Sequence, residues 1–558
     1  MIELPSGRMS GATLRAVLTA MRHTPARHLI AKVFRAQLGI DALSAFPAEM
    51  CAPLPQSFWP LQARPDHGRP SRDLPLPRND EVVGTRALAE AFAAGRTTPV
   101  QLTERVIETI GRLDERTPSA NPFYALREAE ALEDARASDL RHKSGRSLGP
   151  LDGVIVPIKE EVDVMGLPTK LGTRWLPARP AQRDSLAVAR LRAAGALILG
   201  NTVMTEYGMS PLGANPFRAM PRNVFDPGRL PGGSSTGSAV AVALGLGPVA
   251  LGADGGGSIR IPAAYNGLFG LKPTYGRIPL IGHGAVAGSS VIHLGPIASS
   301  AEDLAVFLEA TAGPDPSDPT SFAQPPLAAG EFTSALRRGV EGLRIGVDEE
   351  QWDRTPAALT RPARDALEAL RRDGAELVPV RSRLAMHAAA IGYLTIGLEA
   401  FAALREERSH LDDLTLDLQL TLLGLGTFRP DDYVIAQRLR GELRREIAAL
   451  LTDVDVLALP STGNLPPPIT DAEARSGFVD PVALDEISRY AYVGNLTGIP
   501  AGTAPVGFVD GLPVGLQILG DAWDEACVLQ VLAHLERAGV ASVRRPPGYV
   551  DPLGKAVG

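Results

Sequence analysis

The sequence predicts an α/β protein with an N-terminal helical extension, and three observations support this class. Short apolar, β-branched runs alternate with helical patterns, as at residues 154–158, 186–194 and 197–200. Apolar residues make up 45% of the 558-residue chain and charged residues 21%, which is ordinary for a globular enzyme. A chain of this length can bury a large core as one unit.

Residues 1–81 form an arm whose pattern differs from that of the remaining chain. Apolar residues three and four apart predict helix over residues 10–38. The other side of this helix is basic and carries Arg15, Arg22, Arg27, Lys32 and Arg35. A basic amphipathic helix can lie on a membrane or bind a partner, although such a stripe is more often the solvated face of a packed helix. The proline-rich residues 48–80 predict an extended strap that links the arm to the body.

Regular structure is expected from Val82 onward. The predicted helices span residues 85–94, 99–113, 127–141, 186–194, 236–245, 259–266, 301–312, 362–373, 384–411, 432–451, 481–496 and 524–538. The predicted strands span residues 154–158, 197–200, 249–253, 343–347, 376–380, 454–459, 502–506 and 514–518. The connecting segments are expected at residues 215–232, 273–296 and 315–330, with a hydrophobic stretch at 414–425. We divide the chain into the arm, a catalytic domain at 82–545 and a tail at 546–558.

Composition excludes several classes of protein. The net charge of -7 gives no overall basic footprint for nucleic acid. The two cysteines, Cys51 and Cys527, make neither a disulfide framework nor a metal cluster. The longest apolar run, residues 239–251, is short and is interrupted by two glycines and a proline. We therefore expect a cytoplasmic protein without membrane spans or metal.

A first candidate nucleophile is Ser235, which stands at the centre of a GxSxG pattern formed by residues 233–237. The α/β-hydrolase elbow requires a strand directly before the serine, and Pro227-Gly228-Arg229-Leu230-Pro231 is unsuited to one. The histidines available as a base have no local signature; they are His283, His293, His387, His410 and His534. The elbow interpretation is therefore disfavoured.

Ser258 is a stronger candidate. Gly255-Gly256-Gly257 precedes it directly and follows a predicted strand, so consecutive backbone amides can curl around a small concavity. Such amides can form an oxyanion hole, because glycine lets the backbone approach a tetrahedral oxyanion. A phosphate-binding turn or a merely tight turn would have the same pattern, so this stretch alone leaves the choice open.

Lys159 is the candidate base. It follows the apolar run Val154-Ile155-Val156-Pro157-Ile158, so it should emerge from a strand end where burial disfavours the ammonium form. The chain has only six lysines against 50 arginines, and arginine could not lose its proton. The alternative is a buried lysine that merely pairs with a nearby carboxylate. The carboxylates in question are those of Glu160, Glu161 and Asp163.

Two long stretches resemble the amidase signature family of serine hydrolases. They are GGSSTGSA at residues 232–239 and GADGGGSIRIPAAYNGLFGLKPTYGR at residues 252–277. Ser258 follows Ser234 by 24 residues, the separation between the bridging serine and the nucleophile in that family. Further matching stretches are GPLDGV, VIVPIKEEVDVMGLPT, GPIASSAEDLA and GNLTGIPAGTAPVGFVDGLPVGLQILG. The resemblance covers about residues 82–544.

The resemblance implies a large mixed, twisted β-sheet covered on both faces by helices, and a Ser-cisSer-Lys triad. Ser258 is implied as nucleophile, Ser234 as bridging serine with a cis peptide bond and Lys159 as general base. The implied oxyanion hole consists of the amides of Gly255, Gly256, Gly257 and Ser258. The implied supporting residues are Ser235, Asp254 and Arg260, of which we expect the last two to pair with each other or with nearby backbone. No metal or organic cofactor is implied, because a serine acyl-enzyme forms and hydrolyses without one.

This resemblance predicts an amidohydrolase for a small-molecule amide, ester or carbamate. Two alternatives remain open: the glutamine-hydrolysing subunit of a tRNA-dependent amidotransferase, and a catalytically silent scaffold. The chain departs from the family pattern at Gly255, where Thr or Ile is frequent, and at Thr236, where Ser or Gly is frequent. Residues 1–81 have no counterpart in the family core and could shape an entrance, mediate homodimerisation or attach to a surface. The candidate pocket residues are Glu206, Tyr207, Trp175, the 283–293 connection and the helices of residues 384–425.

Overall fold

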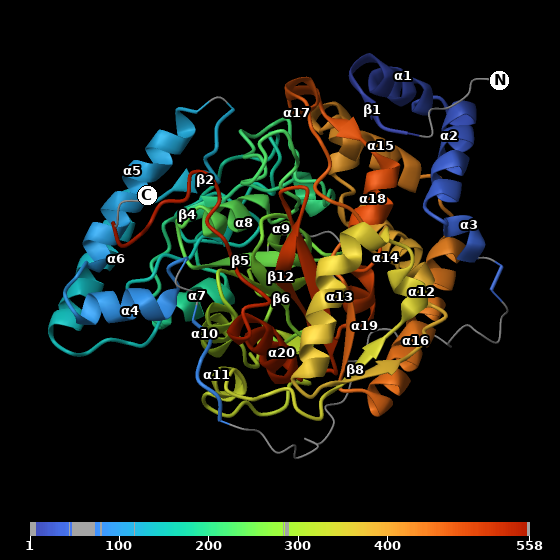
Figure 1. The fold of residues 1–558 in the computed structure, drawn as a ribbon. Helices are drawn as coiled ribbons and strands as arrows, with labels where there is room; N and C mark the ends of the chain where they lie inside the picture. The colour runs from blue at the N-terminus through green and yellow to red at the C-terminus, as the bar shows by residue number, and fades with distance from the viewer. Residues whose placement is uncertain are drawn as a thin grey trace.

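An eleven-stranded mixed sheet forms the centre of the protein (Figure 1). The computed structural model describes residues 7–43, 45–46, 73–78, 81–116, 118–282, 284 and 290–554. The strand order is β2-β4-β3-β5-β7-β6-β12-β13-β10-β8-β9. The strands are β2 (Phe123–Leu126), β3 (Ile158–Lys159), β4 (Gly200–Thr202), β5 (Val249–Asp254), β6 (Phe269–Lys272), β7 (His293–Ala298), β8 (Arg344–Val347), β9 (Glu376–Pro379), β10 (Val456–Pro460), β12 (Ala501–Val509) and β13 (Leu512–Gly520). The predicted α/β class with a large mixed sheet is confirmed.

The sheet combines two parallel groups with antiparallel strands. Strand β3 runs parallel to β4 and β5, and β8 runs parallel to β9 and β10, whereas the remaining pairs are antiparallel. The strand predicted at 154–158 is wrong in extent, because Pro157 has no amide proton for the ladder and only Ile158–Lys159 pair regularly. Ile155 instead forms an isolated bridge with Leu197.

Three strands of this sheet were not expected from the sequence: β2, β6 and β7. Strand β7 lies across the end of the predicted connection at 273–296, and its sequence HLGPIA includes Gly295 and Pro296, which weaken a strand pattern. Its pairing with β5 along all six residues overrides that local signal.

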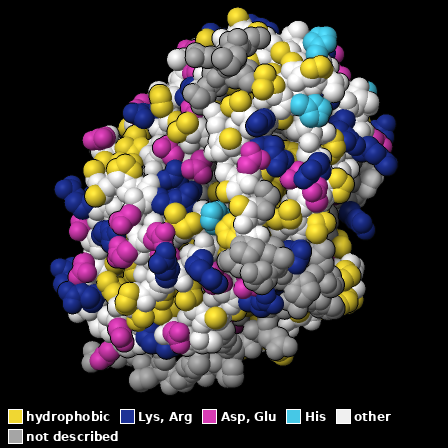
Figure 2. Space-filling view, turned by 90° about the vertical axis from the view of Figure 1, so that its right-hand side faces the viewer, with side chains coloured by type: hydrophobic (Ala, Val, Ile, Leu, Met, Phe, Trp, Pro, Cys, Tyr) yellow, Lys and Arg dark blue, Asp and Glu magenta, His cyan; other side chains and the backbone are white. Residues whose placement is uncertain are grey.

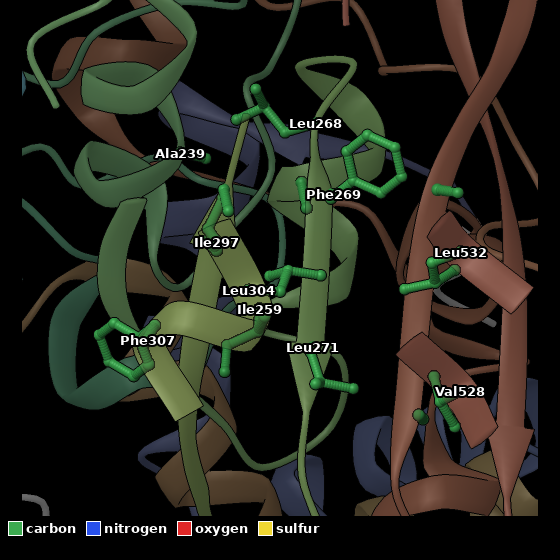
Figure 3. Close-up of a cluster of buried hydrophobic side chains, with 14 of the residues drawn as sticks. Ala239, Ile259, Leu268, Phe269, Leu271, Ile297, Leu304, Phe307, Val528 and Leu532 are labelled. Carbon is green, nitrogen blue, oxygen red and sulfur yellow. The ribbon is translucent and has the colours of Figure 1, made fainter. Parts of the chain in front are cut away.

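Helices cover both faces of the sheet, as predicted. Helices α8 (Thr236–Ala243) and α9 (Arg260–Tyr265) lie on one face. On the other face lie α10 (Ala301–Thr311), α13 (Ala357–Arg372) and α20 (Glu525–Arg537). Figure 3 shows buried side chains on both sides of the sheet, with Ala239 of α8 in the first layer, and with Leu304 of α10 and Leu532 of α20 in the second.

Helix α8 is built of small residues, all of them buried, and this composition positions the serines before it. A Cβ on Gly237 would lie 2.3 Å from the backbone oxygen of Pro122, so only glycine permits this close approach. The helix therefore packs directly on the sheet, and the serine-rich segment at its N-terminus lies at the ends of β3 and β5.

Further helices surround this core at both ends of the sheet. At one end lie α4 (Thr85–Ala93), α5 (Pro99–Asp114), α6 (Glu128–Lys143) and α7 (Leu186–Ala193) (Figure 1). Helix α5 begins as the capping order predicted, with Thr98 accepting from the amide of Gln101 at 3.2 Å. The others are α11 (Glu331–Ala335), α12 (Glu349–Trp352), α14 (Ala388–Ala403), α15 (Leu416–Leu425), α16 (Pro430–Asp453), α17 (Asp471–Ser476), α18 (Pro481–Ser488) and α19 (Tyr492–Thr497).

Two predicted long helices are interrupted. The helix expected at 481–496 is divided into α18 and α19, because Tyr490 between them is buried and donates its hydroxyl to the carbonyl of Gln351 at 2.9 Å. The helix expected at 384–411 is regular only over α14, and Leu404 after it packs into a cluster with Leu414 and Leu418. In both cases side-chain packing overrides a continuous helical pattern.

The N-terminal arm folds onto the body (Figure 1). The helix predicted over 10–38 is two helices, α1 (Gly11–Met21) and α2 (Thr24–Gln37), because Pro25 stands in the first turn of α2. A short helix, α3 (Ile40–Leu43), follows. Leu14, Leu18 and Met21 of α1 pack against Leu420 and Leu423 of α15. Strand β1 (Met9–Ser10) pairs with β11 (Phe478–Val479). The strap at residues 48–80 lies outside the described residues except for 73–78.

Two of the five basic residues on this side of the arm, Arg22 and Arg35, pair with acidic groups. Arg22 forms an ion pair with Asp412, and Arg35 pairs with Asp41 at 2.8 Å and with Asp432 at 3.0 Å. Figure 2 shows basic and acidic side chains interspersed on this side of the molecule. This pairing favours a helix face packed on its own protein over a membrane-binding stripe.

One helical stretch among the described residues, Ala385–Ala403, is long and apolar enough to span a membrane by length and composition. Of its most apolar window, 56% is buried within the fold, and it packs against α16 and α19. This is how a core helix of a globular protein also behaves, so the stretch is weak evidence for a span.

Candidate active site

Three predicted catalytic residues meet at one end of the sheet. Lys159 is the last residue of β3, Ser234 lies just before α8, and Ser258 lies between β5 and α9. Because β3 and β5 are parallel neighbours with α8 packed on both, and α9 packs against α8, the topology brings the three segments together.

Lys159 is almost fully buried, with 1% exposure, and has three acceptors around its Nζ. The Nζ lies 2.7 Å from Ser234 Oγ, 3.3 Å from the carbonyl oxygen of Ala253 and 2.5 Å from Glu161 Oε1. Burial lowers the pKa of Lys159, although the charges of Glu161 and Asp254 raise it. The two sequence interpretations of this lysine thus coexist, since it both pairs with a carboxylate and contacts Ser234.

The peptide bond between Gly233 and Ser234 is cis. Gly208 lies beside Ser234, and a Cβ on Gly208 would be 3.2 Å from Ser234 Oγ and 3.8 Å from Glu161 Oε2. Gly208 follows Tyr207, and both have positive φ angles, of 68° and 50°. Sequence reasoning missed Gly208, which lies in a short turn without a recognisable pattern.

Ser258 is 8% exposed, more than Ser234 or Lys159. Its carbonyl accepts from the amide of Ser235 at 3.3 Å. Within the described parts of the chain, the Ser258 hydroxyl has no hydrogen-bond partner. Lys159 is therefore hydrogen-bonded to Ser234, whereas the described residues show no hydrogen bond between the hydroxyls of Ser234 and Ser258. Catalytic hydrogen bonds of this kind often form only when substrate binds.

The glycine-rich segment presents backbone amides beside Ser258. Among the residues that the structure describes, the amides of Gly255, Gly256 and Ser258 donate no hydrogen bond. The predicted set of four amides needs one correction. The Gly257 amide donates to Asp254 Oδ1 at 2.6 Å, so its single proton is already engaged. Three amides remain for an oxyanion.

Asp254 and Arg260 form a buried ion pair under this segment. The guanidinium donates to both Asp254 oxygens, from Nε and Nη2, at 3.0 Å each. Asn495 donates to Asp254 Oδ1 at 2.9 Å and accepts from Arg260 at 2.6 Å. The pKa of Asp254 is held well below its usual range by Arg260 and Asn495 against the effect of burial.

Ser235 lies next to the site but is fully buried. Its hydroxyl donates to the carbonyl of Ala253 at 3.2 Å and accepts from the amide of Ala253 at 3.3 Å. Both hydroxyl roles are thus used to tie α8 to β5. This arrangement agrees with the low weight given to a Ser235 nucleophile.

The side chains nearest to the Cβ positions of Gly255 and Gly256 are uncharged. A Cβ on Gly255 would lie 2.9 Å from Ile396 Cδ1 and 3.4 Å from Ile292, and one on Gly256 would lie 2.9 Å from the Tyr492 hydroxyl. These three side chains come from α14, the segment before β7 and α19. Ile396 and Ile292 fall within two of the predicted pocket segments, residues 384–425 and 283–293, whereas Tyr492 was not predicted.

The other candidate pocket residues lie in a separate cluster. Trp175 donates to the Tyr207 hydroxyl at 2.9 Å and stacks on His410, and Glu206 accepts from Thr415 at 2.8 Å. Within helices 384–425, Ile396 alone is placed against the amides by these distances. His283 lies outside the described residues.

Comparison with known proteins agrees with this geometry. The family model described as Amidase matches residues 102–529. The chain is 36% identical to one of the subunits of glutamyl-tRNA(Gln) amidotransferase from Chloroflexus aurantiacus, covering 82% of this chain and 97% of that protein. It is 34% identical to fatty acid amide hydrolase of Medicago truncatula, and this match covers 84% of the present chain and 78% of that protein.

A solved structure, that of native peptide amidase from Stenotrophomonas maltophilia, superposes with a TM-score of 0.71 at 29% identity. This match covers 84% of the present chain and 98% of the peptide amidase. The family match extends over most of the sheet and includes all three segments that meet at Lys159. On this evidence the chain belongs to the amidase signature family.

Proposed function

We propose that this protein is an amidohydrolase in which Ser258 is the nucleophile, Ser234 the bridging serine and Lys159 the general base. The observation that carries this proposal is the 2.7 Å hydrogen bond between Lys159 Nζ and Ser234 Oγ inside a buried site. The three unengaged amides beside Ser258 support it, because they can stabilise the oxyanion of a tetrahedral intermediate.

The proposed reaction proceeds through an acyl-enzyme. As Ser258 Oγ attacks the carbonyl carbon, its proton passes to Ser234 and the Ser234 proton passes to neutral Lys159. The proton then returns by the same route to the leaving nitrogen as the carbon–nitrogen bond breaks. Water, activated through the same relay, releases the carboxylic acid. No step requires a metal ion or an organic cofactor.

A second candidate is the glutamine-hydrolysing subunit of a tRNA-dependent amidotransferase. The 36% identity to a glutamyl-tRNA(Gln) amidotransferase protein favours it. Glutamine carries an ammonium and a carboxylate that call for charged partners, whereas Ile396, Ile292 and Tyr492 next to the amides are uncharged. This difference supports hydrolysis of a small-molecule amide, with ester and carbamate as further substrates to examine.

Our proposal for localisation and partners rests on the composition of the chain. We propose a cytoplasmic enzyme that does not bind nucleic acid, on the basis of its negative net charge and its two cysteines. The described cysteine, Cys527, is buried and is not part of a disulfide. A homodimer mediated by the arm would have to use surfaces other than those that α1 buries against α15.

The test is covalent labelling with a fluorophosphonate, which reacts with activated serines. Labelling of the wild type and its loss in Ser258→Ala are expected, with strong slowing in Lys159→Ala and Ser234→Ala. Ser238→Ala is the matched control, since Ser238 is buried in α8 and bonds only to Leu251 and Thr202. Equal labelling of Ser258→Ala would overturn the assignment. A panel of amides, esters, carbamates and glutamine then identifies the substrate class.

A further inference from the structure

Lys159 has a neighbour that the triad does not use. Glu161 is 3% exposed, and its Oε1 lies 2.5 Å from Lys159 Nζ. A Cβ on Gly208 would be within 3.8 Å of Glu161 Oε2 and within 3.2 Å of Ser234 Oγ, so the carboxylate and the bridging serine border the same small space. A buried carboxylate at this place is costly unless it interacts with a charged partner.

The three neighbours of Lys159 Nζ match the needs of a neutral amine. A neutral amine has two N–H bonds and one lone pair. If one N–H bond points to the Ala253 carbonyl and the charge of Glu161 attracts the other, the lone pair faces Ser234 Oγ, where the proton must arrive. Without Glu161, the amine could rotate and donate to Ser234 instead, which would stop the proton transfer.

We propose that Glu161 is a positioning residue that orients the Lys159 amine toward Ser234 and stabilises the ammonium formed when Lys159 accepts the proton. This inference rests on the proposed function of the triad. The proton that leaves Ser258 reaches Lys159 through Ser234, and Glu161 stays a carboxylate throughout. The transient charge on Lys159 is thereby compensated inside a buried site, where an uncompensated charge would be costly.

The other charged groups around Lys159 cannot replace Glu161. Asp254, on the neighbouring strand β5, also raises the pKa of Lys159, but it forms a bidentate ion pair with Arg260. The neighbouring elements β4 and α8 contribute no ionisable side chain. Glu206, next to Gly208, accepts from Thr415, and burial raises its pKa to about 7.

Glu160 provides a matched control in the adjacent position. It is as deeply buried as Glu161, but its carboxylate pairs with Arg218, at 2.8 Å between Oε1 and Nη2, rather than with the Lys159 amine. Both Glu160→Gln and Glu161→Gln remove one buried carboxylate charge while preserving the size of the side chain. Only the second removes the charge in contact with the lysine.

The experiment measures the rate of fluorophosphonate labelling of the full-length protein across pH about 5 to 10, a range that spans the titration of a perturbed lysine. In wild type the rate should rise with pH as Lys159 loses its proton. In Glu161→Gln the ammonium loses its counter-charge, so the midpoint should move to lower pH by about one unit or more. The plateau rate should fall about tenfold or more, because the amine is less basic and less well oriented.

Glu160→Gln should keep the midpoint of the wild type. Glu161→Asp retains the charge on a shorter side chain, so its midpoint and plateau should lie between those of wild type and Glu161→Gln. An unchanged midpoint in folded Glu161→Gln, or an equal shift in Glu160→Gln, would overturn the proposal. If Glu161→Gln does not fold, Glu161→Asp decides, and wild-type values of both its midpoint and its plateau would contradict a positioning role.

Ser258→Ala separates this outcome from a failure of the proposed function. If Ser258→Ala is labelled like wild type, the triad itself is wrong. If Ser258→Ala is unlabelled and the midpoint of Glu161→Gln does not move, the triad stands and only the role of Glu161 is rejected.

Discussion

Asp254 Oδ1 accepts a hydrogen bond from the amide nitrogen of Gly257 at 2.6 Å, and the same carboxylate accepts two hydrogen bonds of 3.0 Å from Arg260. The ion pair thus fixes the backbone of the segment whose other amides face Ser258. Arg260 is held in turn by the carbonyl of Ala491 at 2.9 Å and by Gln517 Oε1 at 2.5 Å. The amides beside Ser258 are therefore positioned by a buried network that reaches α19 and β13.

Asp254→Asn should destabilise the fold and slow labelling together. It leaves the buried Arg260 without its anion, which typically costs about 3 to 5 kcal/mol of unfolding free energy. Loss of one positioned oxyanion donor costs about 10²-fold to 10³-fold in rate, so a fall of that order is expected if the segment shifts. Denaturant unfolding and labelling kinetics measure the two effects.

Arg364→Gln is the control for the loss of an ion pair. Arg364 pairs with Glu349 at 2.7 Å on the surface, where both side chains are more than a third exposed. Its loss should change the unfolding free energy by at most about 1 kcal/mol and leave labelling intact. A labelling rate for Asp254→Asn equal to that of wild type would show that the amides do not depend on this ion pair.

Gly208→Ala should abolish labelling by crowding Ser234. The new Cβ would lie 3.2 Å from Ser234 Oγ, at a position where φ is 68°. Gly342→Ala is the matched control, because Gly342 has φ 73° and open space around the position of its Cβ. Both substitutions carry a backbone cost of about 1 to 2 kcal/mol, but only the first touches the site. Similar labelling in the two variants would refute the crowding argument.

The sequence predicted the fold class and the segments of the site well, because their signals are local. Lys159 follows an apolar run, and Ser258 follows three glycines, so both patterns are contained within a few residues. The helix α8 was also predicted, since its run of small residues allows close packing on a sheet.

The remaining features depend on tertiary contacts that no local pattern contains. The Gly257 amide is not available to an oxyanion because it donates a hydrogen bond to the carboxylate of Asp254, three residues earlier. Ile396, Ile292 and Tyr492 meet beside the glycines only once α14 and α19 are packed. The pairing of Lys159 with Glu161 was one of three carboxylate options, and local sequence had no means to choose among them.

Gly255 marks where this chain departs from the family pattern, and Gly255→Thr tests what that departure does. A Cβ there would lie 2.9 Å from Ile396 Cδ1, so Thr should narrow the space beside the amides. Labelling by a fluorophosphonate with a bulky chain should slow more than labelling by a small one. Adding Ile396→Ala should restore the rate for the bulky probe. Failure of this second change to help would place the crowding elsewhere.

The arm should contribute to stability through α1. Leu14 is fully buried in the cluster with Leu420 and Leu423, so Leu14→Ala should lower the unfolding free energy by about 2 to 5 kcal/mol. Limited proteolysis should then cleave the arm faster. Leu29→Ala is the control, because Leu29 in α2 is 58% exposed and should change the unfolding free energy by less than about 0.5 kcal/mol. Equal protection of both variants would mean that the arm is not stabilised by this cluster.

Glu536 predicts how stability depends on pH. It is buried in α20, accepts from the amide of Ala301 at 3.0 Å and lies near Asp303 and Glu302. Burial, the largest cause, raises the pKa of Glu536 to about 8 from its ordinary value of 4.5. Between these two pH values the folded protein binds a proton that the unfolded chain has released. The free energy of unfolding should therefore fall as pH rises through this window.

Glu536→Gln should remove the part of this pH dependence that Glu536 causes, because an uncharged amide can still accept from Ala301 without the cost of a buried charge. Glu302 and Glu206, whose pKa values are also raised by burial, keep their own contributions. We expect little change at pH about 4, where the carboxyl is neutral in both states, and a gain on the order of 2 to 4 kcal/mol at pH about 9. Glu368→Gln is the control, since Glu368 is 54% exposed at its side chain and pairs only with Arg371. Thermal or denaturant unfolding at the two pH values decides, and a gain of equal size at both would show that the charge of Glu536 is not its cause.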